Sequence, residues 1–367
     1  MKPGTNSNDD KIQEANGSAR RNTLKQTCEG TRQKSSSATE SPKRDALRSE
    51  HPFVSIILCT SGLRPLLVQC LEQLTAETRN YPEHETIVVL NGPENEQFAQ
   101  AVSKFPVRLL NEPRRGVSIA RNYAVPRAKG DILVFVDDDV TVGPKWLDEM
   151  INGFADPDVA CVTGRVIPAG TLSFTAERVA RYYNSERALS GWTLDASNPN
   201  WYQQIIGEPV GFGCNMAFRK SFLEKQCLFP VDLGAGSIIG GGDEFYMYVQ
   251  VVKRGFRIRH TPTAAVTHYF EPNSEKQKAR TAQLYSGSVA FALKLFLEEK
   301  SLRPATAKWL LSAIKRRGRR VWTQKAIASE PQELLSPGEK ILAYLRGLGV
   351  YWKSRRFIKS RSTIPDR

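Results

Sequence analysis

Short apolar runs alternate with amphipathic segments along residues 53–166. Nearly continuous apolar runs are typical of strands covered on both faces, and they occur at residues 53–60, 85–90, 107–110, 131–136 and 159–166. The segments between them predict helices at residues 64–77, 94–104, 118–128 and 144–154, with Ser118 as an N-cap. This alternation predicts an α/β fold with a doubly wound, mostly parallel sheet, which binds ligands at the carboxyl ends of its strands.

The pattern is less regular after residue 170. Helices are predicted over residues 176–190, 216–224 and 244–254, and a Gly-rich loop over residues 230–242. Residues 255–268 predict a strand, a turn and a second strand. From residue 277 onwards the chain is predicted to be helical and basic.

The two ends of the chain differ from its middle. Residues 1–50 are polar and predicted to be disordered, because they cannot bury enough apolar surface to offset the entropy of ordering. Residues 51–275 are predicted to form the folded domain, and a basic helical region follows at 276–367. The N-terminus has no apolar signal-peptide core, and no stretch approaches the roughly 20 apolar residues of a membrane span. Six cysteines without a CxxC pair indicate buried thiols, so we expect a cytoplasmic protein.

The net charge of +14 is confined to the last quarter of the chain. Residues 1–275 carry 31 Lys and Arg against 32 Asp and Glu, whereas residues 276–367 carry 21 against 6. Residues 339–352 place an apolar stripe on one helix, formed by Ile341, Leu342, Leu345 and Leu348 with Tyr344 and Trp352. A basic amphipathic helix with aromatic residues favours peripheral contact with an anionic membrane, here the inner face of the plasma membrane.

The basic region has two other interpretations. The helix could pack on the rest of the protein and leave only a solvated, charged face. Nucleic-acid binding is not expected, because the aromatic residues are not interleaved as in a stacking groove and no nucleic-acid module is present.

The strongest chemical signal is "ILVFVDDDV" at residues 132–140, where three carboxylates follow a buried strand. Packing three acids together is costly unless a cation or a network of donors compensates. Strand alternation puts Asp137 and Asp139 on one face and Asp138 on the other. Two carboxylates on one face suit a hard divalent cation that bridges to phosphate oxygens, whereas an acidic turn capping the next segment is the alternative.

The order of several motifs resembles the large second family of inverting glycosyltransferases with a GT-A fold. The resemblance covers roughly residues 53–272, and three segments carry it: "IILCTSGLR" at 56–64, "IVVLNG" at 87–92 and "GVSIARNYAVPRAKGDILVFVDDD" at 116–139. The matching positions in the last segment are Gly116, Ala120, Arg121, Asn122, Gly130, Asp131, Asp137 and Asp139. The resemblance implies a GT-A domain at residues 51–275, with a nucleotide-binding half at 51–140 and an acceptor half at 141–275.

The resemblance also implies residue roles. Asp139 and His268 would ligate Mn²⁺ or Mg²⁺ on a nucleoside diphosphate sugar, and a neutral imidazole suits such an ion. The residues implied to bind the nucleotide sugar are Thr60, Arg64, Asn91, Arg121, Asp137 and Asp138. The segment that closes over the donor sugar and the acceptor would include Gly213, Asn215 and Gly242. For Arg121 a surface helix position, and for Gly213 and Asn215 a turn and a helix cap, remain open.

The string "GGDEF" at residues 241–245 is the signature of diguanylate cyclases, but its context differs. The cyclases place these letters on a turn between strands, whereas the residues that follow here predict a helix. The glycosyltransferase family instead places a Glu-Asp pair at this helix start, and its Asp acts as base. Here the pair is inverted to Asp243-Glu244, so Glu244 fits by position and Asp243 by residue type. Both acids could also merely stabilise the helix N-terminus.

These features together predict a metal-dependent inverting glycosyltransferase, and two alternative functions remain open. It would move a sugar to a hydroxyl of a saccharide or lipid-linked acceptor, in the synthesis of a cell-surface polysaccharide or glycolipid. A nucleotidyltransferase on a similar scaffold would need a Gly-rich phosphate loop near the first strand, and "CTSGLR" at residues 59–64 is a poor version. The other rival is a catalytically inactive adaptor that binds a membrane surface through its basic region.

Overall fold

The computed structural model describes residues 52–170, 179–180, 182–207, 210–270, 274–311 and 335–362. The predicted disorder of residues 1–50 therefore concerns residues outside the described part. The basic run at residues 315–320 also lies outside the described part, as do residues 176–178 at the start of the helix predicted over residues 176–190.

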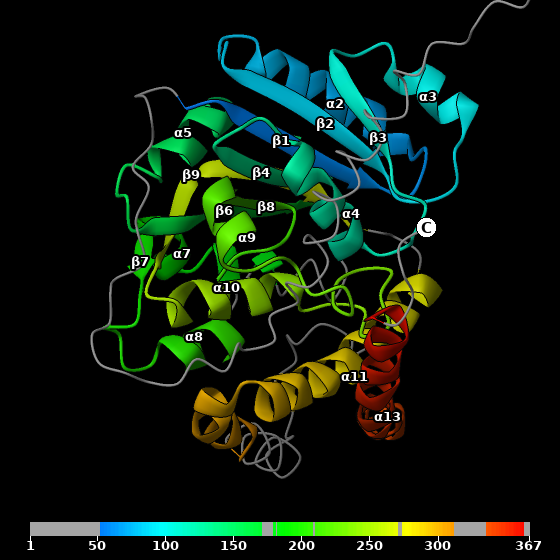
Figure 1. The fold of residues 1–367 in the computed structure, drawn as a ribbon, viewed down its shortest axis with the longest axis vertical. Helices are drawn as coiled ribbons and strands as arrows, with labels where there is room; N and C mark the ends of the chain where they lie inside the picture. The colour runs from blue at the N-terminus through cyan, green and yellow to red at the C-terminus, as the bar shows by residue number, and fades with distance from the viewer. Residues whose placement is uncertain are drawn as a thin grey trace, which may run out of the picture. The chain divides into compact units, whose positions relative to one another are not determined.

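The described residues form one sheet of nine strands (Figure 1). The strands are β1 (Val54–Thr60), β2 (His84–Leu90), β3 (Val107–Asn111), β4 (Ile132–Asp137), β5 (Val140–Val142), β6 (Val159–Ala169), β7 (Trp192–Leu194), β8 (Asn215–Arg219) and β9 (Arg257–Tyr269). Their order is β3-β2-β1-β4-β8-β6-β9-β5, and β7 pairs with β9. Because β8, β5 and β7 pair antiparallel to their neighbours, the other six strands share one direction, as predicted.

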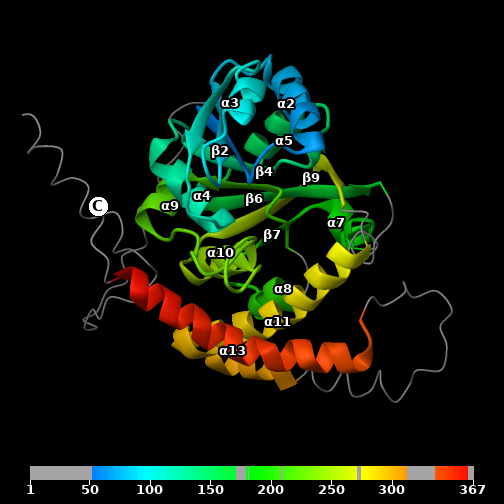
Figure 2. The same cartoon turned by 90° about the vertical axis from the view of Figure 1, so that its right-hand side faces the viewer.

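Helices cover both faces of this sheet. They are α2 (Pro65–Thr78), α3 (Glu96–Val102), α4 (Val117–Ala124), α5 (Trp146–Asn152), α7 (Glu186–Ser190), α8 (Trp201–Gly207), α9 (Lys220–Lys225), α10 (Asp243–Lys253), α11 (Ser274–Glu298) and α13 (Pro337–Ser362). Figure 2 shows α2, α3 and α5 on one side of the sheet, and α10, α8, α11 and α13 on the other. The apolar strands β1 and β4 are buried between these layers, which is why their sequences are continuously apolar.

The prediction of a helix over residues 216–224 was wrong in its first half. Residues Asn215–Arg219 form β8, which lies in the sheet between β4 and β6 and is buried at every position. Only Lys220–Lys225 is helical, as α9. Burial in the middle of the sheet outweighs the local preference of Met216, Ala217 and Phe218, a tertiary effect that local pattern does not contain.

The strand, turn and strand predicted over residues 255–268 form a single long strand, β9. Its register against β6 shifts between Thr261 and Ala265, so the expected turn is an irregularity within the strand. The short strands β5 and β7 were not predicted. Ser118 is not an N-cap, since Gly116 occupies that position and the Ser118 hydroxyl donates to the Leu233 carbonyl at 2.8 Å.

Two further expectations concern cysteines and membrane spans. Cys59, Cys70, Cys161 and Cys214 are free thiols, but Cys227 is disulfide-bonded, which differs from the expectation of thiols throughout. Among the described helices, none combines the length and the apolar character needed to cross a bilayer. The cytoplasmic location stays a prediction.

Candidate active site

The candidate site lies at the carboxyl-end edge of the parallel strands. Strands β2, β1 and β4 are neighbours, and their register pairs Thr60 with Leu90 and Cys59 with Asp137. Thr60 and Asp137 therefore end their strands at one edge, where Asn91 directly follows β2, as the sequence predicted. Chain reversals at this edge leave backbone and side chains of several segments free to converge on a ligand.

The three consecutive acids separate into two environments. Asp138 is buried, accepts a hydrogen bond from the Thr60 hydroxyl, and lies 3.3 Å from Nε of Arg64. Burial raises the pKa of Asp138 to about 6, against the opposing effect of these two partners. Asp138 is therefore held by the protein itself, whereas Asp137 and Asp139 belong to the opposite side of the strand end.

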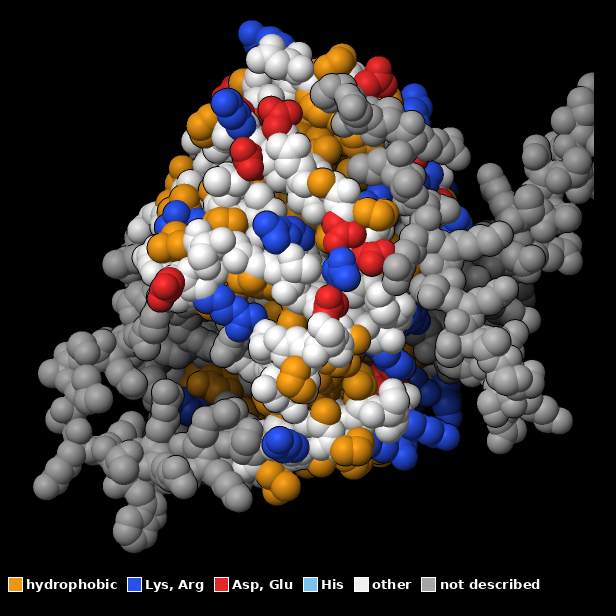
Figure 3. All heavy atoms as spheres, turned by 90° about the vertical axis from the view of Figure 1, so that its left-hand side faces the viewer, with side chains coloured by type: hydrophobic (Ala, Val, Ile, Leu, Met, Phe, Trp, Pro, Cys, Tyr) orange, Lys and Arg blue, Asp and Glu red, His pale blue; other side chains and the backbone are white. Residues whose placement is uncertain are grey.

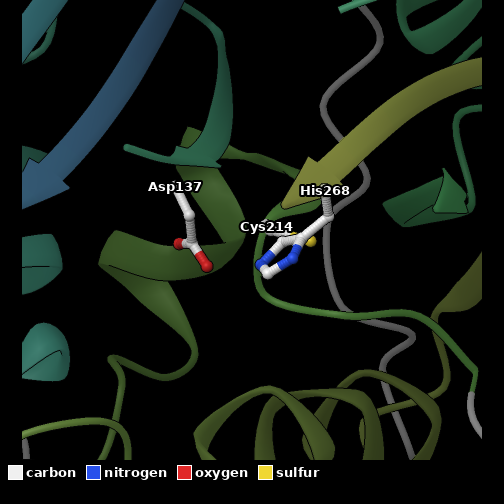
Figure 4. Close-up of side chains that lie close together, drawn as sticks. All are labelled: Asp137, Cys214 and His268. Atoms are coloured by element: carbon white, nitrogen blue, oxygen red, sulfur yellow. The ribbon is translucent and has the colours of Figure 1, made fainter. Parts of the chain in front are cut away.

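A cluster of potential metal ligands lies on that opposite side. One ligand atom each from Asp137, Cys214 and His268 fall within 4.8 Å of one another, and Figure 4 shows the Asp137 and His268 side chains directed into the same space. Oδ1 of Asp139 lies 3.3 Å from Nε2 of His268. His268 reaches the acids because β9 pairs antiparallel with β5, directly after the acidic turn, with His268 opposite Val140.

The chemistry of this cluster fits a divalent cation. Oδ1 of Asp139 and Nδ1 of His268 are buried without a hydrogen-bond partner, and buried polar atoms of this kind call for a ligand. Burial, with the nearby charge of Asp137, raises the pKa of Asp139 to about 7. Burial lowers the pKa of His268, which keeps the imidazole neutral and able to ligate. A bound cation would offset the electrostatic repulsion between these crowded carboxylates.

Cys214 is the one member of this cluster that sequence reasoning missed. The sequence indicates only a buried thiol at this position, and Cys214 is indeed buried. Its nearness to His268 depends on β8 lying next to β4, a pairing that the sequence did not predict. The only signal in the sequence was its position one residue before Asn215 in the implied sugar-facing segment.

Arg121 links the metal cluster to the acidic helix start. It is buried, and Nη1 donates to Oδ2 of Asp243 at 2.5 Å. Nη2 donates to the Gly213 carbonyl at 3.1 Å and lies 3.6 Å from Oδ1 of Asp137. The neighbouring charges of Asp243 and Asp137 outweigh burial and raise the pKa of Arg121. Arg121 is therefore a fixed cation inside the site, and the alternative of a surface helix residue is wrong.

The two acids of the inverted pair differ in their partners. Gly242 adopts φ 83°, the left-handed region that favours glycine, and it caps α10 so that Asp243 and Glu244 occupy the first turn. Asp243 is buried against Arg121, whereas Glu244 is only partly buried. Burial raises the pKa of Glu244 well above its ordinary value, and the charge of Asp243 and a hydrogen bond with it add to the shift. Glu244 is also close enough to Cys214 for its charge to contribute to the raised pKa of that thiol, after burial and the charges of Asp137 and Asp139.

Two of the predicted site residues have their side-chain amides engaged within the fold. Asn91 donates to the carbonyls of Glu112 and Arg114 and accepts from the backbone N–H of Gly116. These bonds fix the loop that leads into α4, and with it the position of Arg121.

Asn215 is engaged in the same way at the centre of the sheet. Its Oδ1 accepts from the Trp146 indole at 2.9 Å, and its Nδ2 donates to the carbonyls of Arg165 and Ala264. These bonds lie at the irregularity where β6 and β9 change register. Asn215 thereby joins α5, β6, β8 and β9 beside the ligand cluster instead of facing a sugar.

The sequence of this chain is similar to those of several known proteins. The sequence model of glycosyl transferase family 2 matches residues 55–226. The chain is 31% identical over 229 residues to the succinoglycan biosynthesis protein ExoM of Rhizobium meliloti, covering 59% of this chain and 67% of that protein. It is 28% identical over 203 residues to the glycosyltransferase AglE of Haloferax volcanii, covering 54% of this chain and 60% of that protein. The chain thus spans little more than half the length of several curated relatives that it matches.

The fold is also similar to that of a solved structure. The crystal structure of S. aureus TarS 1-349 superimposes with a TM-score of 0.50 at 16% identity, covering 86% of this chain and 93% of that one. This similarity supports the mixed α/β, mostly parallel GT-A architecture that the sequence predicted. The match to ExoM over two thirds of its length, together with the family model over residues 55–226, shows that the chain belongs to glycosyl transferase family 2.

Proposed function

We propose that the protein transfers a sugar from a nucleoside diphosphate donor to an acceptor hydroxyl, in the synthesis of a cell-surface polysaccharide or glycolipid. One observation carries the proposal. The acids after β4, the imidazole of His268 and the acidic start of α10 meet around the buried Arg121. Groups able to hold a metal cation that binds the donor diphosphate, and a group able to accept a proton, therefore lie at the same edge of the sheet.

In this proposal Asp137, Asp139 and His268 hold Mn²⁺ or Mg²⁺, with Cys214 within reach of the same ion. The unpaired Asp139 and His268 atoms support this assignment. Such an ion, when bound, supplies positive charge where the departing diphosphate gains negative charge. Carboxylate oxygens suit either ion, and the neutral imidazole of His268 is a better ligand for Mn²⁺ than for Mg²⁺, which prefers oxygen ligands.

Glu244 is the proposed general base. Asp243 is committed to the buried ion pair with Arg121. Glu244 is the less buried of the two acids, and its raised pKa makes it a strong proton acceptor once ionised. Asp243 and Arg121 then act as positioning residues, which hold the first turn of α10 against β4.

The proposed reaction is a single displacement with inversion. The acceptor oxygen bonds to the anomeric carbon as the bond between that carbon and the phosphate oxygen breaks. Glu244 takes the hydroxyl proton, and the electron pair of the broken bond leaves with the nucleoside diphosphate. Arg64 is half exposed beside Asp138, so its guanidinium can also contact the nucleotide from the end of β1.

A thermal-shift panel tests donor binding directly. The protein is heated with UDP-, GDP- and dTDP-sugars, each with and without Mn²⁺. A ligand that binds only the folded state raises the melting temperature by mass action, so one nucleotide class should stabilise the protein in the presence of Mn²⁺. A panel without any stabilising donor, with or without Mn²⁺, would count against the proposal and favour an inactive adaptor.

A further inference from the structure

Helix α13 exposes a stripe of large apolar side chains. Ile341, Leu345 and Trp352 are 61%, 60% and 60% exposed, and Leu342 and Leu348 are nearly half exposed. These positions recur at helical spacing, so they lie along one side of the helix. Single exposed apolar residues are ordinary on protein surfaces, but a contiguous row marks an interaction site.

The opposite side of α13 packs on α11 and contains small or polar residues. Ala343, Gly347, Tyr351 and Ser354 are buried or closely packed there. A Cβ on Gly347 would meet the Ser286 carbonyl oxygen at 2.5 Å, so only glycine allows this approach. A helix that served only to cover the protein would bury its apolar side. Here the apolar stripe faces away from α11, contrary to the interpretation of a packed helix with a solvated, charged face.

Positive charge borders the stripe. Arg346, Lys353, Arg356 and Lys359 are exposed on α13, while Glu339, the single acid of this helix, pairs with Lys278 at 2.9 Å. Arg346 and Lys353 each follow a stripe residue by one position, about 100° around the helix. Figure 3 views the fold from the side opposite to α13, which lies at the right in Figure 1; there, Lys, Arg, Asp and Glu side chains are interspersed over the middle of the face, and Lys and Arg gather at the lower right.

We propose that this face of α13 docks on a membrane surface that contains anionic lipid. The apolar stripe would enter the boundary between headgroups and acyl chains, and the adjacent cations would contact the headgroups. Trp352, amphipathic and exposed at the stripe, suits that boundary. The apolar row and the cations lie side by side along one helix, so a partner must contact both along its length. An anionic lipid surface does so and therefore fits this face better than an acidic protein partner.

The docked helix is tied to the loop that precedes the proposed base. Asp232 begins this loop and is buried; its Oδ2 accepts from the Ser354 hydroxyl on α13 at 2.6 Å and from Nζ of Lys294 on α11 at 3.1 Å. Farther along, a Cβ on Gly242 would meet the Phe291 ring of α11 at 3.1 Å.

A surface fixed to α13 is therefore fixed relative to Glu244. Docking would hold the proposed site at a fixed distance from the lipid surface, which suits a lipid-linked acceptor; this last step rests on the proposed sugar transfer.

Vesicle co-sedimentation of the full chain tests the docking. The vesicles contain phosphatidylcholine alone, or phosphatidylcholine mixed with phosphatidylglycerol. The wild type should sediment with the mixed vesicles and much less with the neutral ones, and added salt should weaken the binding. The double variant Leu345→Glu/Leu348→Glu should bind at least about tenfold more weakly. Leu189→Glu, at an exposed leucine of α7, is the matched control and should bind like the wild type.

Two further readouts separate the possible failures. Melting temperatures near that of the wild type would show that the variants fold, as expected for exposed positions. Slow hydrolysis of the sugar donor without vesicles should be equal in all variants. If no variant hydrolyses any donor, the sugar transfer fails while the vesicle result stands on its own.

The docking is overturned if the wild type ignores anionic vesicles, or if the double variant binds them equally well. Self-association of the wild type that the double variant abolishes, without vesicle binding by either, would instead identify the stripe as a contact between two copies of the chain.

Discussion

The paired variants Glu244→Gln and Asp243→Asn separate two neighbouring acids that the sequence could not rank. Both changes remove a charge and keep the side-chain volume. If Glu244 is the base, Glu244→Gln should lower kcat by about 10²–10⁴-fold, the usual contribution of a general base. Its KM for the donor should change little, because the described ion pairs of Asp137 and Asp139 are with Arg121 and His268 and do not depend on Glu244.

Asp243→Asn should act mainly on stability. Asp243 is buried against Arg121, and removing one partner of a buried ion pair typically costs about 3–5 kcal/mol. The lower end applies here, because Arg121 keeps the Gly213 carbonyl and the Asp137 carboxylate and the new amide oxygen can still accept a hydrogen bond. About 3 kcal/mol corresponds to a melting temperature lower by roughly 6–12 °C for a domain of this size.

The pH dependence supplies a second readout for Glu244. Its pKa is raised in the folded protein, so the folded state keeps the proton to higher pH than the unfolded chain does. Its contribution to stability is therefore complete below the ordinary Glu pKa and is lost as the pH rises through the raised value. Glu244→Gln should flatten this decline. Activity of the wild type should show the opposite trend and rise over the same window, because the base must be ionised.

Two assays measure these effects: steady-state release of nucleoside diphosphate and thermal unfolding, each carried out as a function of pH. The result that refutes the reasoning is a reversed pattern, in which Asp243→Asn loses turnover without losing stability and Glu244→Gln remains fully active. Full activity in both variants would remove the pair from catalysis altogether.

Three further predictions address the rest of the site. Asp139→Asn or His268→Ala should weaken Mn²⁺ binding at least about tenfold, measured by calorimetry on the folded protein; unchanged affinity would contradict the ligand assignment. Asn215→Ala should lower the unfolding free energy by about 3 kcal/mol or more, because it strands buried partners, while KM for the donor stays the same in the folded fraction. Lys294→Met should lower the free energy of unfolding by about 3–5 kcal/mol, because it leaves the Asp232 carboxylate buried without its cation. Chemical denaturation measures this free energy, and an unchanged value would contradict the prediction.

The fold was predicted well where pattern is local. The apolar runs of β1, β2 and β4 identified the parallel half of the sheet, because a strand buried on both faces must be apolar throughout. The sequence failed at β8, whose Met216–Phe218 segment is compatible with a helix. Only its place between β4 and β6 makes it a strand. Its pairing with β4 joins residues some eighty positions apart.

The candidate site shows the same division. The sequence identified Asp137, Asp139 and His268 by motif order, and the structure brings them together. It could not show that Asn215 is a structural hydrogen-bonding hub, nor that Cys214 approaches His268, because both follow from the position of β8. The ion pair between Arg121 and Asp243 was likewise beyond reach, since it joins residues 122 positions apart.

The central claim is that this protein releases a nucleoside diphosphate from a sugar donor through the cluster at the end of β4. The most direct measurement is that release, with UDP-, GDP- and dTDP-sugars and Mn²⁺, for the wild type and Asp139→Asn in parallel. We predict release from one donor class by the wild type, abolished by chelation of the metal and strongly reduced in Asp139→Asn. Equal release by both proteins, or none from any donor, would contradict the account.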